Sequence, residues 1–389
     1  RVRIGEASGA VPYDMALMNV SAMSFGSLSG PAITALNEGA RRGGFAHDTG
    51  EGAVSPYHLQ GGDLGWEIGT AYVGCRTADG GFSPDRFAEL CRQTDAIKLI
   101  SIKLSQGAKP GLGGVLPGEK VTQEIADTRG VPVGQTVVSP GYHSAFDGPK
   151  GLVDFVVRLR ELSGNLPTGF KLCVGERAQF LAVLRAMIAA DAYPDFIIVD
   201  GSEGGTGAAP LEFEDHAGTP LDDGLTTVHR ALVGAGLRDR IKVGASGKVA
   251  SGFDIARRLA QGADYTNSAR TMMFALGCIQ ARECHTNKCP SGVTSNNPMV
   301  TRGLDVEDKA QRVCAYQHST IANFNTSLGV LGHDSCRQIR PDQFVRRISQ
   351  TEELRYDQLW PELPEGSLLD GSAPEDWMSD WRAAGKIAT

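Results

Sequence analysis

Residues 241–290 read IKVGASGKVASGFDIARRLAQGADYTNSARTMMFALGCIQARECHTNKCP and combine two kinds of chemistry. A short apolar strand enters a turn that contains Gly244, Ser246 and Gly247, and a helix is expected over 252–261. Glycines let backbone N–H groups close on an anion, and a helix N-terminus adds positive potential. The pattern predicts a phosphate-binding turn, although Gly-rich strand-to-helix turns also occur without a ligand.

The second half of this stretch places Cys278, Cys284 and Cys289 at C-x5-C-x4-C. The other cysteines are isolated, so three thiols in one loop favour a metal or cluster site over simple packing. The spacing differs from the paired C-x2-C of a structural zinc site, and no fourth cysteine is near in sequence. Three ligands would suit an iron–sulfur cluster, with His285 as a fourth ligand or as a hydrogen-bond donor beside it.

Composition narrows the class of protein. The chain has 389 residues, 49 of them glycine, and a net charge of −7. Without a basic stripe, nucleic acid is not an expected partner. The sequence shows no apolar run of 18 residues and no signal peptide, and isolated thiols suit a reducing compartment, so a cytoplasmic location is expected. The first residue is Arg1, which predicts a processed protein or a segment of a longer one, with any membrane anchor upstream.

Strand–loop–helix units recur about eight times along the chain. Polar residues stand just after the expected strands: Ser24, Thr49, Lys103, Lys171, Glu203, Ser246 and Ser268. A (β/α)8 TIM barrel collects its site at the carboxyl ends of all its strands, whereas a doubly wound sheet concentrates it at one switch point. The distribution favours the barrel.

Several local features refine this expectation. Ser29 is expected to cap a helix over 29–42, and the Gly-rich region 53–77 is expected to be loop. A long helix is expected over 307–331, and the segment beyond Glu352 reads as an extended arm. We expect residues 1–300, with the cysteine loop 278–289, to form the barrel domain, and residues 301–389 to form a C-terminal helical and extended extension packed on it.

Three lysines are candidate site residues. Lys103 and Lys109 flank Gln106 after an apolar strand, where a cation can donate to an electron-rich ring or a carboxylate. Lys171 lies within a strand, where a charge needs a partner or a ligand. By contrast, Arg129 reads on its own as a surface charge at a helix end.

The acids and histidines leave alternatives open. Asp200 and Glu203 could act as acid or base, or could cap the loop after their strand. His47 and His143 are compatible with a site role, but a lone histidine is more often packed and hydrogen-bonded.

Several segments together resemble the flavin-binding domain of ferredoxin-dependent and bacterial glutamate synthases, above all stand-alone FMN-binding members of that family. They are MSFGSLS (23–29), HDTGEG (47–52), KLSQGAKPGLGGVLPGEKV (103–121), KLCVG (171–175), DGSEGGTGAAP (200–210), HRALVGAGLRDRIKV (229–243) and GCIQARECHTNKCPSGV (277–293). The resemblance implies an FMN-carrying barrel with a [3Fe-4S] cluster on Cys278, Cys284 and Cys289. It implies electron flow from a donor, such as ferredoxin or a reductase subunit, through the cluster to FMN, which reduces a 2-imino acid formed from 2-oxoglutarate and ammonia.

The resemblance also implies roles for individual residues. Lys103, Lys171 and Glu203 would be catalytic, and Lys109 and Arg129 would grip the carboxylates of the substrate, as paired cations can. The FMN site would comprise Met23, Ser24, Thr49, Lys103, Gln106, Lys171, Gly204, Gly205, Thr206, Ser246, Gly247, Ser268, Ala269 and Arg270.

One departure concerns the substrate. Val115 replaces a substrate-binding Gln of the family and cannot donate a hydrogen bond, which predicts preference for a related oxo acid or imine. No glutaminase sequence is present, so free ammonia, an amine or a separate amidotransferase subunit would supply nitrogen. The alternatives are an electron-relay subunit of a larger complex and an FMN-dependent dehydrogenase or isomerase with a structural cysteine cluster. A homo-oligomer is compatible with the sequence.

Overall fold

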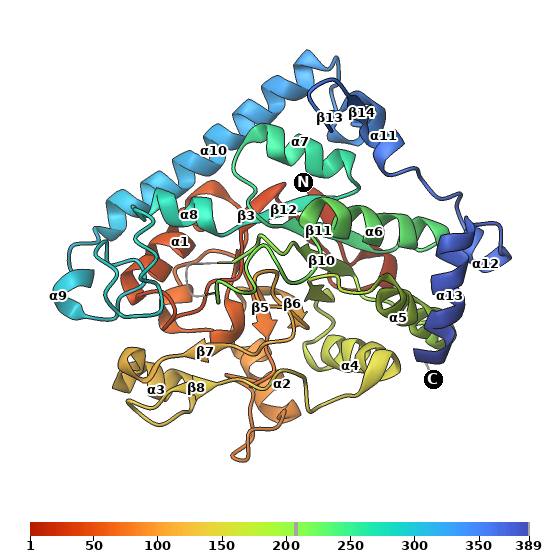
Figure 1. Ribbon diagram of the computed structural model, residues 1–389. Coiled ribbons are helices and arrows are strands. Elements are labelled where there is room, and N and C mark those ends of the chain that lie inside the picture. The colour runs from red at the N-terminus through yellow and green to blue at the C-terminus, as the bar shows by residue number, and fades with distance from the viewer. Residues whose placement is uncertain (206–208, 388–389) are drawn as a thin grey trace.

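A closed barrel of parallel strands forms the centre of the protein (Figure 1). The computed structural model describes residues 1–205 and 209–387. Within these residues, the eight barrel strands are β3 (Met18–Val20), β4 (His47–Asp48), β5 (Leu64–Ile68), β6 (Ile97–Lys103), β9 (Thr168–Leu172), β10 (Phe196–Asp200), β11 (Lys242–Ser246) and β12 (Tyr265–Ser268). Strand β12 pairs in parallel with β3 and closes the ring. The predicted (β/α)8 barrel is confirmed, and the open doubly wound sheet is wrong.

Helices surround the barrel. They are α1 (Gly30–Gly43), α2 (Pro84–Gln93), α4 (Gly148–Leu162), α5 (Arg177–Ala190), α6 (Leu221–Gly234), α7 (Gly252–Ala260) and α10 (Val306–Val330). The predicted cap of α1 is confirmed, because the Ser29 hydroxyl accepts from the backbone N–H of Ala32 at 3.3 Å and Pro31 lies in the first turn. Helix α10 packs beside α1 and α7. The division into 1–300 and 301–389 stays a prediction.

A hairpin seals the amino end of the barrel. Strands β1 (Val2–Ile4) and β2 (Tyr13–Met15) pair antiparallel, and Ile4 and Met15 share an apolar cluster with Phe196 and Tyr265. These last two residues begin β10 and β12, so the cluster fills the amino end of the barrel. The described residues thus close the amino end of the barrel, and a ligand site is expected at the carboxyl ends of the strands.

One barrel strand was not expected. The region 53–77 was expected to be loop, but it contains β5, whose residues are all buried between β4 and β6. Gly65 and Glu67 hide the apolar pattern of this strand. Glu67 is buried in an ion pair with Lys171 on β9, and a sequence window cannot show a partner so distant along the chain.

Two long connections build the rim of the site. Between β6 and β9 lie β7 (Val115–Leu116), α3 (Gln123–Arg129) and β8 (Val137–Val138), and the two strands pair as an antiparallel hairpin. Between β12 and α10 lie α8 (Arg270–Ala275), the cysteine loop and α9 (Pro298–Thr301). Both excursions are visible to one side of the barrel in Figure 1.

The C-terminal segment contains a helix where an extended arm was expected. The chain forms β13 (Val345–Arg347), β14 (Glu353–Arg355), α11 (Tyr356–Leu359), α12 (Ser367–Asp370) and α13 (Glu375–Ile387). Trp377 and Trp381 are one helical turn apart, and each lies under a guanidinium of α5. The distances are 4.3 Å from Arg177 to the Trp377 ring and 4.7 Å from Arg185 to the Trp381 ring. These two cation–π contacts hold α13 against α5 (Figure 1).

In the described part of the chain, no helix combines the length and the apolar composition needed to cross a membrane.

Candidate active site

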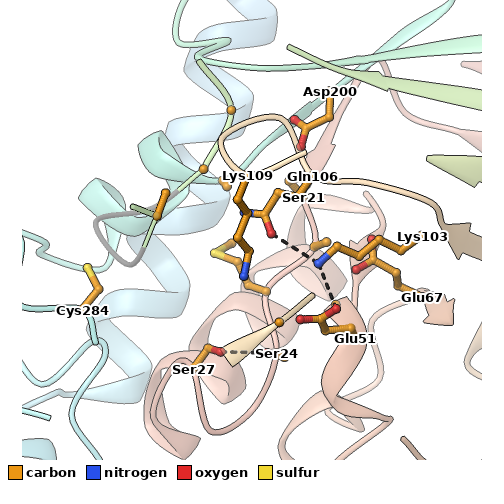
Figure 2. Close-up of a pocket in the computed structure, with 18 of the residues that line it drawn as sticks. Ser21, Ser24, Ser27, Glu51, Glu67, Lys103, Gln106, Lys109, Asp200 and Cys284 are labelled. Carbon is orange, nitrogen blue, oxygen red and sulfur yellow. Dashed lines mark hydrogen bonds and ion pairs between the residues drawn. The ribbon is translucent and has the colours of Figure 1, made fainter. Parts of the chain in front are cut away.

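A cavity of about 300 Å³ opens at the carboxyl ends of the barrel strands (Figure 2). The structure brings most of the predicted site residues together on its walls. They are Met23, Ser24, Lys103, Gln106, Lys109, Arg129, Lys171, Glu203, Gly204, Gly205, Ser246, Gly247, Ser268, Ala269, Arg270 and Cys284. The cavity falls within the size range of roughly 300–1,000 Å³ that is common for small-molecule sites.

One predicted flavin residue, Thr49, does not line the cavity. Thr49 is fully buried, its hydroxyl donates to the carbonyl of Gly50, and it accepts from the backbone N–H of Glu67. It therefore supports the wall from behind. Thr206 lies outside the described residues.

Two ion pairs form the inner part of the cavity. Lys171 on β9 pairs with Glu67 on β5, and both side chains are almost fully buried. Lys103 at the end of β6 donates to Glu51 at 2.9 Å and to the side-chain oxygen of Gln106 at 3.3 Å (Figure 2). Both lysines are thus held in place by carboxylates from other strands or loops.

The pKa values of the inner acids follow their neighbours. Burial alone would raise the pKa of Glu51, but the charges of Lys103 and Lys109 lower it to about 2. Burial and the charge of Glu67 raise the pKa of Asp48 to about 7. Glu51 is therefore ionised near neutral pH, while the pKa of Asp48 is shifted in the opposite direction.

A second pair of cations feels the charge of Glu51 but makes no direct ion pair within the described residues. Arg129, at the end of α3, is only 6% exposed and donates to the carbonyl of Phe25 at 2.6 Å and to Ser24 Oγ at 3.2 Å. Its Nε is buried and makes no hydrogen bond within the described residues. Lys109 makes no ion pair within the described residues, and burial, together with Lys103, lowers its pKa. These two side chains can bind an anion.

The turns after β11 and β12 form another wall. The strands pair side by side, and Gly247 adopts φ +139°, which side chains rarely tolerate. The Ser268 hydroxyl donates to the carbonyl of Val249 at 2.8 Å, and Arg270 pairs with Glu214 at 2.7 Å. The expected phosphate-binding turn is therefore a backbone edge that lines the cavity and is held by side-chain contacts.

The loop after β10 packs too tightly for side chains at Gly204 and Gly205. A Cβ on Gly204 would lie 2.3 Å from Asp200 Oδ1, and one on Gly205 would lie 2.4 Å from Ala108 Cβ. Asp200 accepts from the backbone N–H of Gly107 at 2.8 Å. Glu203 lines the cavity and also accepts from the backbone N–H of Leu221, the first residue of α6, at 3.0 Å.

The cysteines meet at a second, smaller cavity. Cys278, Cys284 and Cys289 all line a space of about 90 Å³, and Cys284 also lines the large cavity. Within the described residues, no group of three His, Cys, Asp or Glu side chains is arranged to hold a metal ion. The loop contains left-handed backbone at Gln280 and Arg282, and the N–H of Gln280 points to Cys278 Sγ at 3.5 Å.

Sequence reasoning missed three charged residues of the site. Glu51 lies in the quoted segment HDTGEG, but no role was inferred for it. Glu67 was hidden in the unexpected strand. Lys120 is buried and its ammonium donates to the carbonyls of Ser27 at 2.6 Å and Cys284 at 3.0 Å. Lys120 belongs to the segment 103–121 that resembles the family, and this position could have indicated a role in the site.

The two histidines have different environments. The His143 ring contacts the Tyr72 hydroxyl at 3.1 Å and the Lys103 carbonyl at 3.0 Å, so it is a packed, hydrogen-bonded histidine. His47 is fully buried, and neither ring nitrogen has a hydrogen-bond partner within the described residues. Burial lowers its pKa well below the ordinary value.

Comparison with known proteins connects this geometry to a family. Residues 13–334 match the family described as "Conserved region in glutamate synthase". The chain is 43% identical over 316 residues to the glutamate synthase large subunit-like protein YerD of Bacillus subtilis, covering 80% of this chain and 60% of that protein. It is 32% identical over 328 residues to the archaeal-type glutamate synthase [NADPH] of Thermotoga neapolitana, covering 84% and 61%. The chain thus spans about three fifths of these relatives.

A solved structure agrees with the fold. A mutant flavocytochrome b2 with sulfite bound superimposes with a TM-score of 0.50 at 13% sequence identity, covering 84% of this chain and 68% of that chain. At this identity, the likeness concerns the barrel alone. The match over residues 13–334, with all seven quoted segments inside it, identifies the chain as a member of the glutamate synthase conserved-region family.

Proposed function

We propose that this protein is a glutamate synthase-like oxidoreductase that carries FMN in the large cavity and a [3Fe-4S] cluster at the cysteine loop. The observation that carries the proposal is the contact between the two cavities. Cys284, Arg270 and Thr294 line both of them. A redox centre bound by the cysteines would therefore lie directly beside a ligand in the barrel.

The residues present fit FMN. The cavity wall after β11 and β12 would receive a terminal phosphate on the backbone N–H groups around Gly247, Ser268 and Ala269. Lys103 and Lys171 would lie along the ring and ribityl chain, each oriented by its carboxylate partner. Bound FMN would supply hydride transfer to an electrophilic carbon.

The cysteine loop offers the donor set for the cluster. Three thiols face one cavity, and burial of Cys289 is outweighed by hydrogen bonds from Ser291 and Thr294, so its pKa is lowered. Thiolates are the ligands that iron–sulfur clusters require. Cys278, Cys284 and Cys289 would hold the cluster, and electrons would come from ferredoxin or a reductase subunit.

The unpaired cations would bind the substrate. The guanidinium of Arg129 and Lys109 Nζ, which both line the cavity, would grip the carboxylate of a 2-oxo acid or its imine. Lys103 Nζ, fixed between Glu51 and Gln106, would be a candidate proton donor near the reacting carbon. Ammonia, an amine or a separate amidotransferase subunit would supply nitrogen.

Anaerobic purification tests both cofactors. We expect FMN, released by heat and identified by chromatography, and about three irons per chain with sulfide. Cys284→Ser should abolish the paramagnetic resonance of the oxidised cluster while FMN stays bound. Cys336→Ser, which alters a cysteine outside this loop, should leave both unchanged.

The outcomes separate the competing functions. FAD in place of FMN, or no flavin in fresh protein, would refute the flavin assignment. Stoichiometric zinc without iron would favour a dehydrogenase or isomerase with a structural cysteine site. Iron and FMN without turnover of any oxo acid would favour an electron-relay subunit.

A further inference from the structure

The outer wall of the large cavity is apolar. Leu112, Val115 and Val138 line it and are 44%, 55% and 67% exposed. Val115 and Val138 lie directly opposite each other in the β7–β8 pair, so their side chains share one face of the hairpin. Exposed apolar side chains beside a charged cavity indicate that part of the ligand is apolar.

The hairpin that carries this wall is attached to the barrel. Thr70, just after β5, donates to the carbonyl of Pro140 at 2.6 Å and attaches the hairpin to the barrel. Within the hairpin, the backbone N–H of Ser139 donates to the carbonyl of Gly114 at 2.8 Å. A Cβ on Gly113 would lie 1.9 Å from the carbonyl oxygen of Ser139, so the two segments are in close contact. The wall is therefore formed before any ligand arrives.

The apolar wall is continuous with the charged part of the cavity. A Cβ on Gly114 would lie 1.8 Å from Glu51 Oε1, so the residue before Val115 touches the carboxylate that pairs with Lys103. Arg129, with its unsatisfied Nε, comes from the same connection between β6 and β9. One excursion of the chain thus supplies both a carboxylate-binding cation and an apolar surface.

We infer that the cavity binds a monocarboxylic 2-oxo acid, or its imine, with an aliphatic chain. Its carboxylate lies at Arg129 and Lys109, and its chain lies along Val115 and Val138. A second carboxylate at this wall would lose water without gaining a donor from the valines. The inference rests on the proposed function for the reaction and specifies the class of substrate.

Calorimetric titration of the purified protein tests the inference through binding alone. The ligands are 2-oxobutyrate, 2-oxopentanoate, 2-oxohexanoate and 2-oxoglutarate. Affinity should rise about fourfold for each added methylene, and 2-oxohexanoate should bind more tightly than 2-oxoglutarate. Equal affinity along the series, or tightest binding of 2-oxoglutarate, would overturn the inference.

A double substitution tests whether Val115 and Val138 cause the dependence of affinity on the chain length of the ligand. Val115→Thr with Val138→Thr keeps the shape of both side chains but replaces one methyl group of each with a hydroxyl. The increase in affinity with each added methylene of the ligand should therefore become smaller. Val345→Thr is the matched control, because Val345 is 59% exposed on β13, in another two-stranded antiparallel pair. An increase that survives the double substitution unchanged would place the chain elsewhere and contradict the inference.

The proposed function and the inferred substrate class can be refuted separately. If flavin and iron are absent, the proposed function fails, yet the binding series still reports on the wall. If 2-oxoglutarate binds best and reoxidises the reduced flavin, the proposed function stands and the aliphatic substrate class is wrong.

Discussion

Two pairs of cations at the mouth of the same barrel differ in whether a carboxylate contacts them directly. Lys103 and Lys171 each contact a carboxylate, Glu51 and Glu67 respectively. Lys109 and Arg129 have no ion-pair partner within the described residues. The first pair is neutralised by carboxylates of the protein itself, whereas the second pair can form an ion pair with a ligand.

Because these cations are buried or partly buried, the presence or absence of an ion pair decides what a substitution changes. A buried ion pair is costly to break, because the remaining partner becomes an uncompensated charge. An unpaired cation in a cavity instead lowers the free energy of an incoming anion. Substitutions in the first pair should therefore act mainly on stability, and substitutions in the second pair mainly on binding.

The largest effect is expected at Lys171. Lys171→Met leaves Glu67 buried and unpaired, so the free energy of unfolding in chemical denaturation should fall by about 3–5 kcal/mol. Adding Glu67→Gln to this variant should recover much of the loss. If the single and double variants were equally unstable, the ion pair would not be the cause.

The next effect is expected at Arg129. Arg129→Gln removes a charge-assisted contact worth about 1.5–3 kcal/mol, so the dissociation constant of a bound 2-oxo acid should rise roughly 10- to 150-fold. Calorimetric titration measures it. An unchanged dissociation constant with lowered stability would assign Arg129 to the first class of cation.

A smaller effect of pH is expected through Lys109. Burial and Lys103 lower its pKa, and only the charged form attracts a carboxylate, so affinity should fall as pH rises, and the fall should begin below the ordinary lysine range. Lys109→Arg should move this loss to higher pH, since arginine stays charged. Identical pH profiles for the two proteins would exclude Lys109 from the site.

The smallest effect is expected at the apolar wall. Val115→Gln supplies one neutral donor worth about 0.5–1.5 kcal/mol, so the affinity for 2-oxoglutarate should improve roughly two- to twelvefold. Val345→Gln is the surface control, and it should change nothing. Improved affinity for 2-oxohexanoate instead would contradict the assigned role of the wall.

The sequence predicted the barrel because most of its strands are apolar and buried on both faces. It missed β5, since the Gly65 and Glu67 positions interrupt that pattern. The burial of Glu67 depends on Lys171, which lies 104 positions further along the chain. The need of Lys171 for a partner could be predicted from its place within a strand, but the partner itself could not.

Helix α13 and Arg129 were also not predicted correctly from the sequence. Helix α13 was missed because its segment is rich in residues typical of loops, although Trp377 and Trp381 are spaced by one helical turn. Arg129 reads as a surface charge until the excursion between β6 and β9 folds over the barrel mouth and buries it. Such burial depends on tertiary packing, which no local window contains.

The central claim is that the unpaired cations present an oxo acid or its imine to a redox cofactor in the barrel. Stopped-flow reoxidation of the dithionite-reduced protein tests it most directly, under strict anaerobiosis, with oxo acids in the presence and absence of ammonia or methylamine. The account predicts reoxidation above the buffer rate that requires an amine, is fastest with an aliphatic 2-oxo acid, is slow with 2-oxoglutarate and is lost in Arg129→Gln. Reoxidation at the buffer rate by every compound would contradict it.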